Sequence, residues 1–449
     1  MVYTASKGAK HYQTLSLDSV GAHRVRNRLV CLVSLFAIFT QPLFFSLSGL
    51  IGFEYGGVDE SPVYALYVIL VFIAIVFVFL LSFVKKPSVS KTEFGFYVFF
   101  LVLIANHLIW VSLDSNETRL WPDNLTFFLS MGLTGFMAVR VIHAFGAWHE
   151  LIRLTEVLVI LMAIGLVVVI VQPYLTGFRV RGIGGASYQA ASYYAAMCFG
   201  LLGVATFRLE PTYRYRVFCS RIFIVLNVTL LIALILAVIL NGGRGAFVLL
   251  ALYTALIVYW IATKRGMTIR GVIRFATTVM LVPIILGLLL RNILGDSLLA
   301  PGFNRAIAFI GSPDGGLIDL EGGSSGRDRV YGVALRGIAE SPWIGHGAFG
   351  HWEKIIHPHN LVLDLALQFG IAMSMAVVFV AAAIFVRRVR PLNTEKVWLL
   401  TLYLYPVINL MFSGGYLRSS LFWFGLAGIL VVGSQGRGVI NGNNSRSQY

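Results

Sequence analysis

The sequence predicts an all-α membrane protein that crosses the bilayer about twelve times. Three observations carry this prediction. The chain is 58% apolar and only 12% charged, whereas about 25% of the residues in a soluble protein are charged. Its mean hydropathy is +0.81. Its apolar runs have the roughly 20-residue length of transmembrane helices and lack the alternation of the shorter membrane β-strands.

The chain divides into two tails, two groups of spans and one long polar loop. Residues 1–28 form a polar, basic tail that we expect to be disordered at its start. Transmembrane helices follow over 29–294, the loop over 295–358, further helices over 359–434, and a second polar tail over 435–449. The predicted spans are 29–50, 63–84, 94–113, 125–144, 154–172, 186–207, 222–240, 245–263, 273–294, 359–386, 396–412 and 420–434. The first of them is too long for a signal peptide and is predicted to stay as an anchor.

Lysine and arginine residues set the predicted orientation. With the N-terminus in the cytoplasm, roughly two thirds of the 35 basic residues fall on the cytoplasmic side, as the positive-inside rule requires. Most acids fall on the other side. We therefore expect both termini in the cytoplasm and the loop 295–358 outside it. Because this rule accounts for the net charge of +15, the charge does not indicate nucleic-acid binding.

Some arginines are predicted on the outer side, where the same rule disfavours them. They are Arg179, Arg181, Arg244, Arg291, Arg305, Arg327, Arg329, Arg336 and Arg418. One interpretation is an anion site on the outer face. The other is snorkelling at the interface or pairing with nearby acids. For Arg244, held in the turn NGGRGAF at a helix end, the anion site is the favoured interpretation.

Residues 327–340 are predicted to form a short amphipathic helix within the loop. At 100° per residue, one face collects Val330, Tyr331, Ala334, Leu335 and Ile338. Arg327 falls on that apolar face at the N-terminal turn, where it needs an anionic partner such as a phosphate or a neighbouring acid. Arg329, Arg336 and Glu340 point the opposite way and are expected in solvent.

The segment HPHN and the span after it carry the remaining polar chemistry. Pro358 disfavours helix at His357, so the span is expected to begin near His359. A histidine there has a pKa suited to a general base. Asn360, Asp364 and Gln368 follow at intervals of four residues and form one polar stripe. An acid inside a span suggests a functional site, although helix–helix hydrogen bonding is an equal alternative for Asp364.

Several other motifs are weak. Four histidines, at 346, 351, 357 and 359, match no zinc spacing, so no metal is expected. GHGAFG at 345–350 has the form GxGxxG but follows no strand, and we interpret it as a turn. The sequence GxxxxGK[ST] is absent from the chain, which excludes this kind of ATP site. No cofactor is predicted.

Three segments together resemble the O-antigen ligase and polymerase superfamily of bacterial envelopes. They are NGGRGAF at 241–247, GSSGRDRVYGVALRGIAESPWIGHGAFG at 323–350 and HPHNLVLDLALQFGI at 357–371. The segment FRVRGIGGASYQAAS at 178–192 resembles an earlier outer loop of the family but lacks its usual asparagine. The resemblance covers the middle and C-terminal half of the chain.

The resemblance implies a metal-independent glycosyltransferase with a GT-C-like fold in the bacterial inner membrane. Its donor would be an undecaprenyl-diphosphate-linked glycan, and its active site would face the periplasm. By analogy, Arg244 and Arg327, with Arg181, bind the diphosphate, and His359 or His357 activates the acceptor hydroxyl, with Asn360 and Asp364 in support. A polymerase would extend a lipid-linked glycan, with a chain-length regulator as a candidate partner, and a ligase would transfer it to lipid A–core. A transporter or flippase is the alternative from another class.

Overall fold

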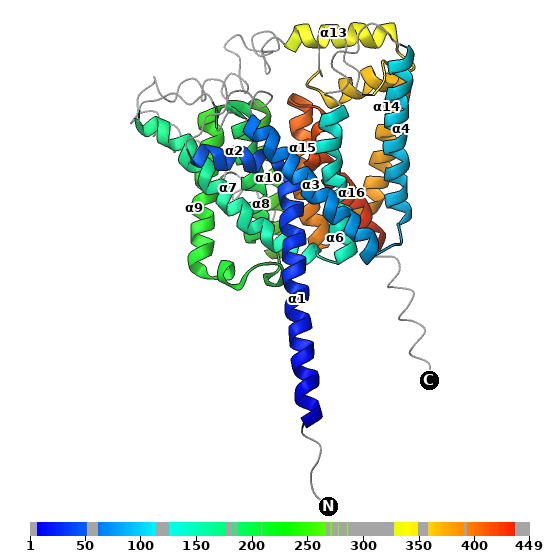
Figure 1. The fold of residues 1–449 in the computed structure, drawn as a ribbon. Coiled ribbons are helices and arrows are strands. Elements are labelled where there is room, and N and C mark those ends of the chain that lie inside the picture. Colours follow the sequence, from blue (N-terminus) through cyan, green and yellow to red (C-terminus); the bar gives the residue numbers. More distant parts are fainter. Residues whose placement is uncertain are drawn as a thin grey trace, which may run out of the picture.

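In a computed structural model the described residues are almost entirely helical (Figure 1). The structure describes residues 7–51, 62–113, 125–176, 182–183, 186–207, 209–265, 270–271, 277, 285, 327–348, 358–389 and 393–435. The long helices are α1 (Lys7–Ile38), α2 (Thr40–Leu50), α3 (Pro62–Lys85), α4 (Lys91–Leu113), α6 (Leu133–Phe145), α7 (Trp148–Thr176), α8 (Tyr188–Phe207), α9 (Arg221–Asn241), α10 (Arg244–Arg265), α13 (Arg327–Glu340), α14 (Leu361–Val389), α15 (Thr394–Phe412) and α16 (Ser420–Gln435). One π-helical turn, η2 (Phe128–Gly132), precedes α6, and three 3₁₀ turns are η3 (Pro211–Tyr213), η4 (Arg216–Cys219) and η5 (Tyr416–Arg418). Strands β1 (Gly182–Ile183) and β2 (Ala186–Ser187) form one short antiparallel pair.

The prediction of a multi-pass helical membrane protein is confirmed. Within the described ranges, 8 helices are long and apolar enough to cross a membrane, and α1 with α2 adds one bent pair. The helices α15 and α16 occupy the predicted spans 396–412 and 420–434 but do not meet that criterion. The predicted span 273–294 lies almost wholly outside the described residues. Twelve crossings therefore stay a prediction, as does a GT-C-like arrangement.

The predicted first span, 29–50, is wrong as a single helix. The chain bends by 87° between α1 and α2. Pro42 has no N–H to donate to the carbonyl of Ile38, so the helical hydrogen-bond pattern stops there. Ser420 of α16 donates to that carbonyl instead, at 2.9 Å. Thr40 Oγ1 donates to the carbonyls of Phe36 and Ala37, each at 2.9 Å, and so satisfies the end of α1.

Helix α1 begins at Lys7, within the basic tail, and runs through the rest of it without interruption, whereas the start of the tail, which was expected to be disordered, lies outside the described residues. The N-terminal part of α1 projects from one end of the bundle, and α13 lies across the opposite end (Figure 1). We call these the basic end and the loop end. Lys85 ends α3, Arg221 begins α9 and Arg265 ends α10, so a basic residue stands at each of these helix termini.

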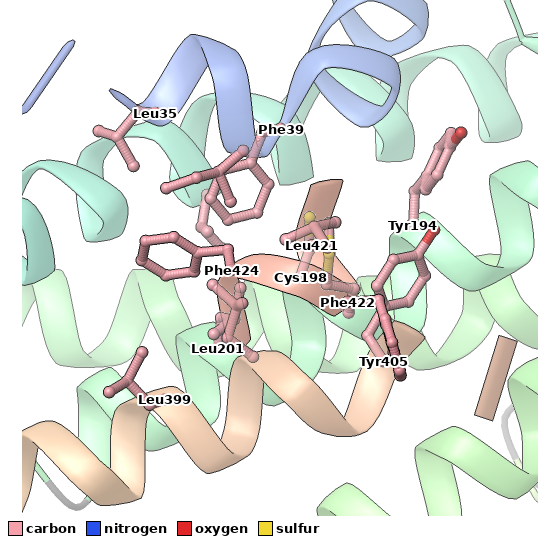
Figure 2. Packing of buried hydrophobic residues seen from close by; sticks show 14 of the residues in the cluster. Leu35, Phe39, Tyr194, Cys198, Leu201, Leu399, Tyr405, Leu421, Phe422 and Phe424 are labelled. Carbon is pink, nitrogen blue, oxygen red and sulfur yellow. The ribbon is translucent and has the colours of Figure 1, made fainter. Parts of the chain in front are cut away.

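The core is formed by helices from both halves of the chain. Side chains of α1, α8, α15 and α16 converge in one apolar cluster, which includes Leu35, Cys198, Leu399 and Phe424 (Figure 2). Of the spans, α8 is the most enclosed, with 83% of its most apolar stretch buried, whereas α14 has 11%. The α8 helix is therefore central, and α14 presents most of its second half to lipid.

Two glycines bring the C-terminal segment directly against α6 and the π-helical turn before it. A Cβ at Gly132 would collide with the carbonyl of Leu417, and one at Gly135 with the carbonyl of Ser420. Backbones approach this closely in membrane bundles only where small residues permit it. The contact fixes η5 and its Arg418 at the loop end beside the π-helical turn Phe128–Gly132.

Candidate functional site at the loop end

The amphipathic helix predicted at 327–340 is confirmed with the same bounds by α13. Its buried face is rotated from the predicted one: Val333 is buried at 8% exposure, whereas Leu335, which was predicted to be buried, is 56% exposed. The packing of α13 on the first half of α14, where Ile338 contacts Ala366 and Leu367, sets this rotation. As predicted, the outward-facing residues of α13 are exposed: Arg329, Arg336 and Glu340. The helix begins at Arg327, whose side chain lies outside the described part.

The segment after α13 folds back onto α14, and its glycines make this possible. The amide of Gly347 donates to the carbonyl of Gln368 at 2.9 Å, and Ile371 donates to Pro342 at 2.7 Å. Gly345 and Gly370 have φ of +67° and +75°. A Cβ at Gly345 would collide with the backbone of Gln368, and a Cβ at Gly370 with the backbone of Trp343. GHGAFG is therefore a turn over its described residues, as predicted. The same contact breaks α14 at Gly370, which has non-helical backbone angles.

The C-terminal part of α4 holds the same turn from the other side. Asn106 Oδ1 accepts a hydrogen bond from the amide of Ala348 at 2.8 Å, and His107 Nδ1 lies 2.8 Å from the Ala348 carbonyl oxygen. A Cβ at Gly347 would collide with the Trp110 ring. His346, one of the four clustered histidines, contacts the Gly337 carbonyl through Nε2 at 2.8 Å. His346 therefore has a structural contact to α13.

The HPHN segment leads into α14, as predicted, and the helix begins at Leu361, close to the expected start near His359. Asn360 is its N-cap: its Oδ1 accepts from the amides of Val362 and Leu363 at 3.0 and 3.2 Å. His359 is half-buried and has φ +54°, the one positive value at a non-glycine residue in the described ranges. Such strained positions cluster at functional sites. His357 lies outside the described residues.

Asp364 and Gln368 form the polar stripe that their spacing predicted, and the structure extends it. Gln368 Nε2 donates to Asp364 Oδ1 at 2.8 Å, and the hydroxyl of Tyr416 donates to Gln368 Oε1 at 2.7 Å. All three side chains are buried, at 3–6% exposure. Arg418 lies close enough to act on the Asp364 carboxylate electrostatically, and its guanidinium stacks on the Phe127 ring at 4.3 Å from the centroid. Asp364 of α14 is thus linked through Gln368 to Tyr416 of η5.

The turn that carries Arg244 is packed tightly against two neighbouring helices. Gly242 ends α9 with φ +67°, and the amide of Gly243 donates to Ser192 Oγ at 3.3 Å. A Cβ at Gly245 would collide with Tyr193 of α8 and lie 2.8 Å from Phe412 of α15. Arg244 is the first residue of α10 and is half-buried.

Two polar groups of this turn have no partner among the residues that the structure describes. Within the described residues, Arg244 makes no hydrogen bond or ion pair. Asn241 is 7% exposed, and its amide nitrogen has no hydrogen-bond partner in the same part of the chain. A guanidinium, an amide and the first N–H groups of a helix all favour an anion.

A chain of contacts connects the Arg244 turn to the His359 segment. Phe412, which packs on Gly245, ends α15, and η5 follows four residues later with Tyr416, which bonds to Gln368 of α14. Both segments therefore lie at the loop end. Arg181 lies outside the described residues, but β1 follows it directly and β2 leads into α8, the helix that packs on the Arg244 turn.

The sequence analysis did not identify the residues that hold Gln368 and the turn 345–348 in place. These residues are Tyr416, Asn106 and His107; none belongs to a recognisable motif, and each contacts the site from a distant part of the chain. The one available signal was a histidine and an asparagine in an otherwise apolar span, which membrane helices retain where they find a partner. In the part of the chain that the structure describes, no cluster of three His, Cys, Asp or Glu residues has metal-binding geometry.

Comparison with known proteins adds no family. No family model matches the chain, and no curated protein matches it. The fold and the site define the class only as a multi-pass helical membrane protein with a polar assembly at its loop end.

Proposed function

We propose that this protein is a glycosyltransferase that polymerises undecaprenyl-diphosphate-linked oligosaccharides on the outer face of a bacterial inner membrane. The proposal takes the basic end as cytoplasmic. The observation that carries it is the half-buried Arg244, which has no partner in the described residues. It stands at the N-terminus of α10 in the same turn as Asn241, whose buried amide nitrogen has no partner in the described residues, and the contacts of Phe412 and Tyr416 connect this turn to α14. An anionic group of the donor would be a suitable partner for both.

In the proposed reaction, a hydroxyl of the acceptor sugar attacks the anomeric carbon of the donor. The bond from that carbon to the diphosphate oxygen breaks, and its electron pair leaves with the diphosphate. Arg244, Arg327 and Arg181 stabilise the growing charge on the leaving group. The imidazole of His359 or His357 accepts the hydroxyl proton. No metal is required, because the arginines supply the positive charge.

The supporting residues have separate roles in this proposal. Asn360 caps α14 and so fixes the backbone next to His359. Asp364, with Gln368 and Tyr416, holds the first half of α14 against η5. A geometry fixed by such contacts is what a transferase needs to place a base near an acceptor hydroxyl.

The experiment is reconstitution of the purified full-length protein with lipid-linked repeat units and a chelator. Elongated, carrier-linked glycan is the expected product. Arg244→Gln removes the charge, and Arg336→Gln removes an equivalent charge from the exposed face of α13 as a matched control. We expect Arg244→Gln to lower the rate by about 10²-fold or more, the usual loss for one group that stabilises a leaving oxyanion, and Arg336→Gln to leave it unchanged. Equal rates for the two variants would remove Arg244 from the site.

The acceptor distinguishes polymerase from ligase. A polymerase extends one lipid-linked glycan at the expense of another. A ligase leaves the lipid-linked pool unextended and transfers glycan to added lipid A–core. Supplying both acceptors in one assay separates the two activities by the size and the lipid of the product.

Transport is a second candidate because two helices are broken. The α1–α2 pair bends by 87°, and α14 breaks at Gly370. Transporters often bind substrate at such breaks. Vesicles that move a lipid-linked glycan between leaflets without lengthening it would support transport over the transferase.

A further inference from the structure

A cleft of about 540 Å³, lined by polar and charged residues together with backbone of a turn, opens at the basic end, away from the candidate site. His23, Arg24 and Asn27 of α1 line one side, and Gly146, Ala147, His149 and Glu150 line the other. Gly146 ends α6 with φ +63°, so the chain turns sharply into α7. The thiol of Cys31 lies 3.5 Å from the Ala147 carbonyl oxygen, which fixes α1 beside this turn.

The one acid in the cleft wall is already engaged by cations and a hydroxyl. Glu150 Oε1 accepts from Arg28 Nε at 3.0 Å and from the Tyr215 hydroxyl at 3.3 Å. Arg153 lies 3.9 Å from Glu150 Oε2. Arg24, in contrast, has no acid within 4.0 Å among the described residues. The cleft therefore has an excess of positive charge.

Neutral donors and an acceptor complete the wall. The first helical hydrogen bond of α7 runs from Leu151 to Ala147, so the N–H groups of Trp148, His149 and Glu150 precede the helical pattern. Independently of them, the side-chain oxygen Oδ1 of Asn27 is buried and has no hydrogen-bond partner within the described ranges. An acceptor with no partner is suited to a hydroxyl on the same ligand that carries the anion.

We propose that this cleft binds a phosphate group, with Arg24 as its main cation and Asn27 accepting from a neighbouring hydroxyl. The volume lies within the roughly 300–1,000 Å³ of ordinary ligand sites. The ligand is either the headgroup of an anionic phospholipid or a soluble phosphate compound. The position supports the headgroup, because α1 becomes apolar at Leu29, so the cleft lies at the level of the membrane surface.

The test is a binding titration of the full-length protein in a neutral detergent. One arm uses short-chain phosphatidylglycerol, which carries a phosphate and hydroxyls, and the other uses inorganic phosphate. We expect saturable binding in at least one arm. Arg24→Gln should weaken it by about tenfold or more, the effect of one charge-assisted hydrogen bond. Asn27→Ala should weaken binding of the lipid more than that of inorganic phosphate, because the glycerol hydroxyls of the lipid extend beyond the phosphate group that Arg24 binds.

Arg26→Gln is the matched control. Arg26 belongs to the same helix and loses the same charge, but it lies over the Phe145 ring, 5.7 Å from its centroid, and does not line the cleft. Its affinity should stay within about twofold of the parent, because a charge outside the cleft acts only through screened solvent. Selective binding of phosphatidylglycerol identifies a lipid site, and equal binding of inorganic phosphate identifies a soluble ligand. No saturable binding in either arm, or equal losses for Arg24→Gln and Arg26→Gln, would overturn the proposal.

Discussion

The hydroxyl of Tyr416 donates to Oε1 of Gln368 across 2.7 Å, and the two residues are 48 positions apart in the chain. The bond is buried on both sides. It joins the turn before α16 to the first half of α14, which also carries Asp364 and begins next to His359. The position of the candidate base therefore depends on a contact between two segments that local sequence does not relate.

Removing this hydroxyl should destabilise the protein. Tyr416→Phe leaves Gln368 Oε1 buried without its donor, and we expect a loss of about 1–3 kcal/mol in the free energy of unfolding. Tyr259→Phe is the matched control, because Tyr259 is 59% exposed on α10. Thermal unfolding of both variants in the same detergent measures the difference. Identical midpoints would show that the Tyr416 bond contributes no stability.

The glycines of the turn against α14 provide a second prediction. Gly370→Ala places a Cβ against the Trp343 carbonyl at a position with φ +75° and ψ 167°, which glycine alone adopts readily, and we expect it to cost more than about 2 kcal/mol. Gly146→Ala is a comparison without a clash, because Gly146 is in the αL conformation and has open space around its Cβ position, so we expect about 1 kcal/mol there. Gly95→Ala, on the open side of α4, should be neutral or stabilising.

Local features of the fold were predictable from the sequence. The 3.6-residue period set the bounds of α13, and the glycines of GHGAFG marked a turn, because both depend on neighbouring residues alone. Features set by distant contacts were not. Pro42 is visible in the sequence, but nothing local indicates that Ser420 would take over its missing bond and stabilise a sharp bend. The prediction that Leu335 is buried is wrong for the same reason: the contact with α14, a distant segment, decides which face of α13 is buried.

The bend between α1 and α2 should depend on Ser420. Ser420→Ala leaves the buried carbonyl of Ile38 without its donor, so we expect a loss of about 1–3 kcal/mol in stability. Ser112→Ala removes the hydroxyl from an exposed serine that bonds only to its own helix, and it should change stability by less than about 0.5 kcal/mol. If the two variants unfold at the same temperature, the bend is held by packing alone.

Two ion pairs at the basic end should differ greatly in what they contribute. Glu156 and Arg214 meet at 2.6 Å with side chains 1% and 5% exposed, whereas Arg28 in its pair with Glu150 is 49% exposed. Glu156→Gln leaves a buried arginine without its counter-charge, at a cost of about 3–5 kcal/mol. Arg28→Gln breaks an exposed pair worth about 0–1 kcal/mol. Unfolding midpoints measured at low and high salt check both values, because only the exposed pair should respond to salt.

His359 provides the prediction that separates stability from catalysis. Its φ of +54° costs roughly 1 kcal/mol for a residue with a Cβ, and glycine adopts this conformation without that cost. The relief of this strain should offset part of the contacts that the imidazole makes, so His359→Gly should stay folded with a change of no more than about 1 kcal/mol in stability, while it abolishes the proposed elongation of the lipid-linked glycan. His359→Asn, which tolerates the same backbone conformation, should be equally stable and equally inactive. Retained stability together with lost activity is the result expected if a histidine occupies this strained backbone position because its imidazole is needed for the reaction. A folded, fully active His359→Gly variant would assign the base to another residue, and His357→Gly in the same assay would test the neighbouring histidine.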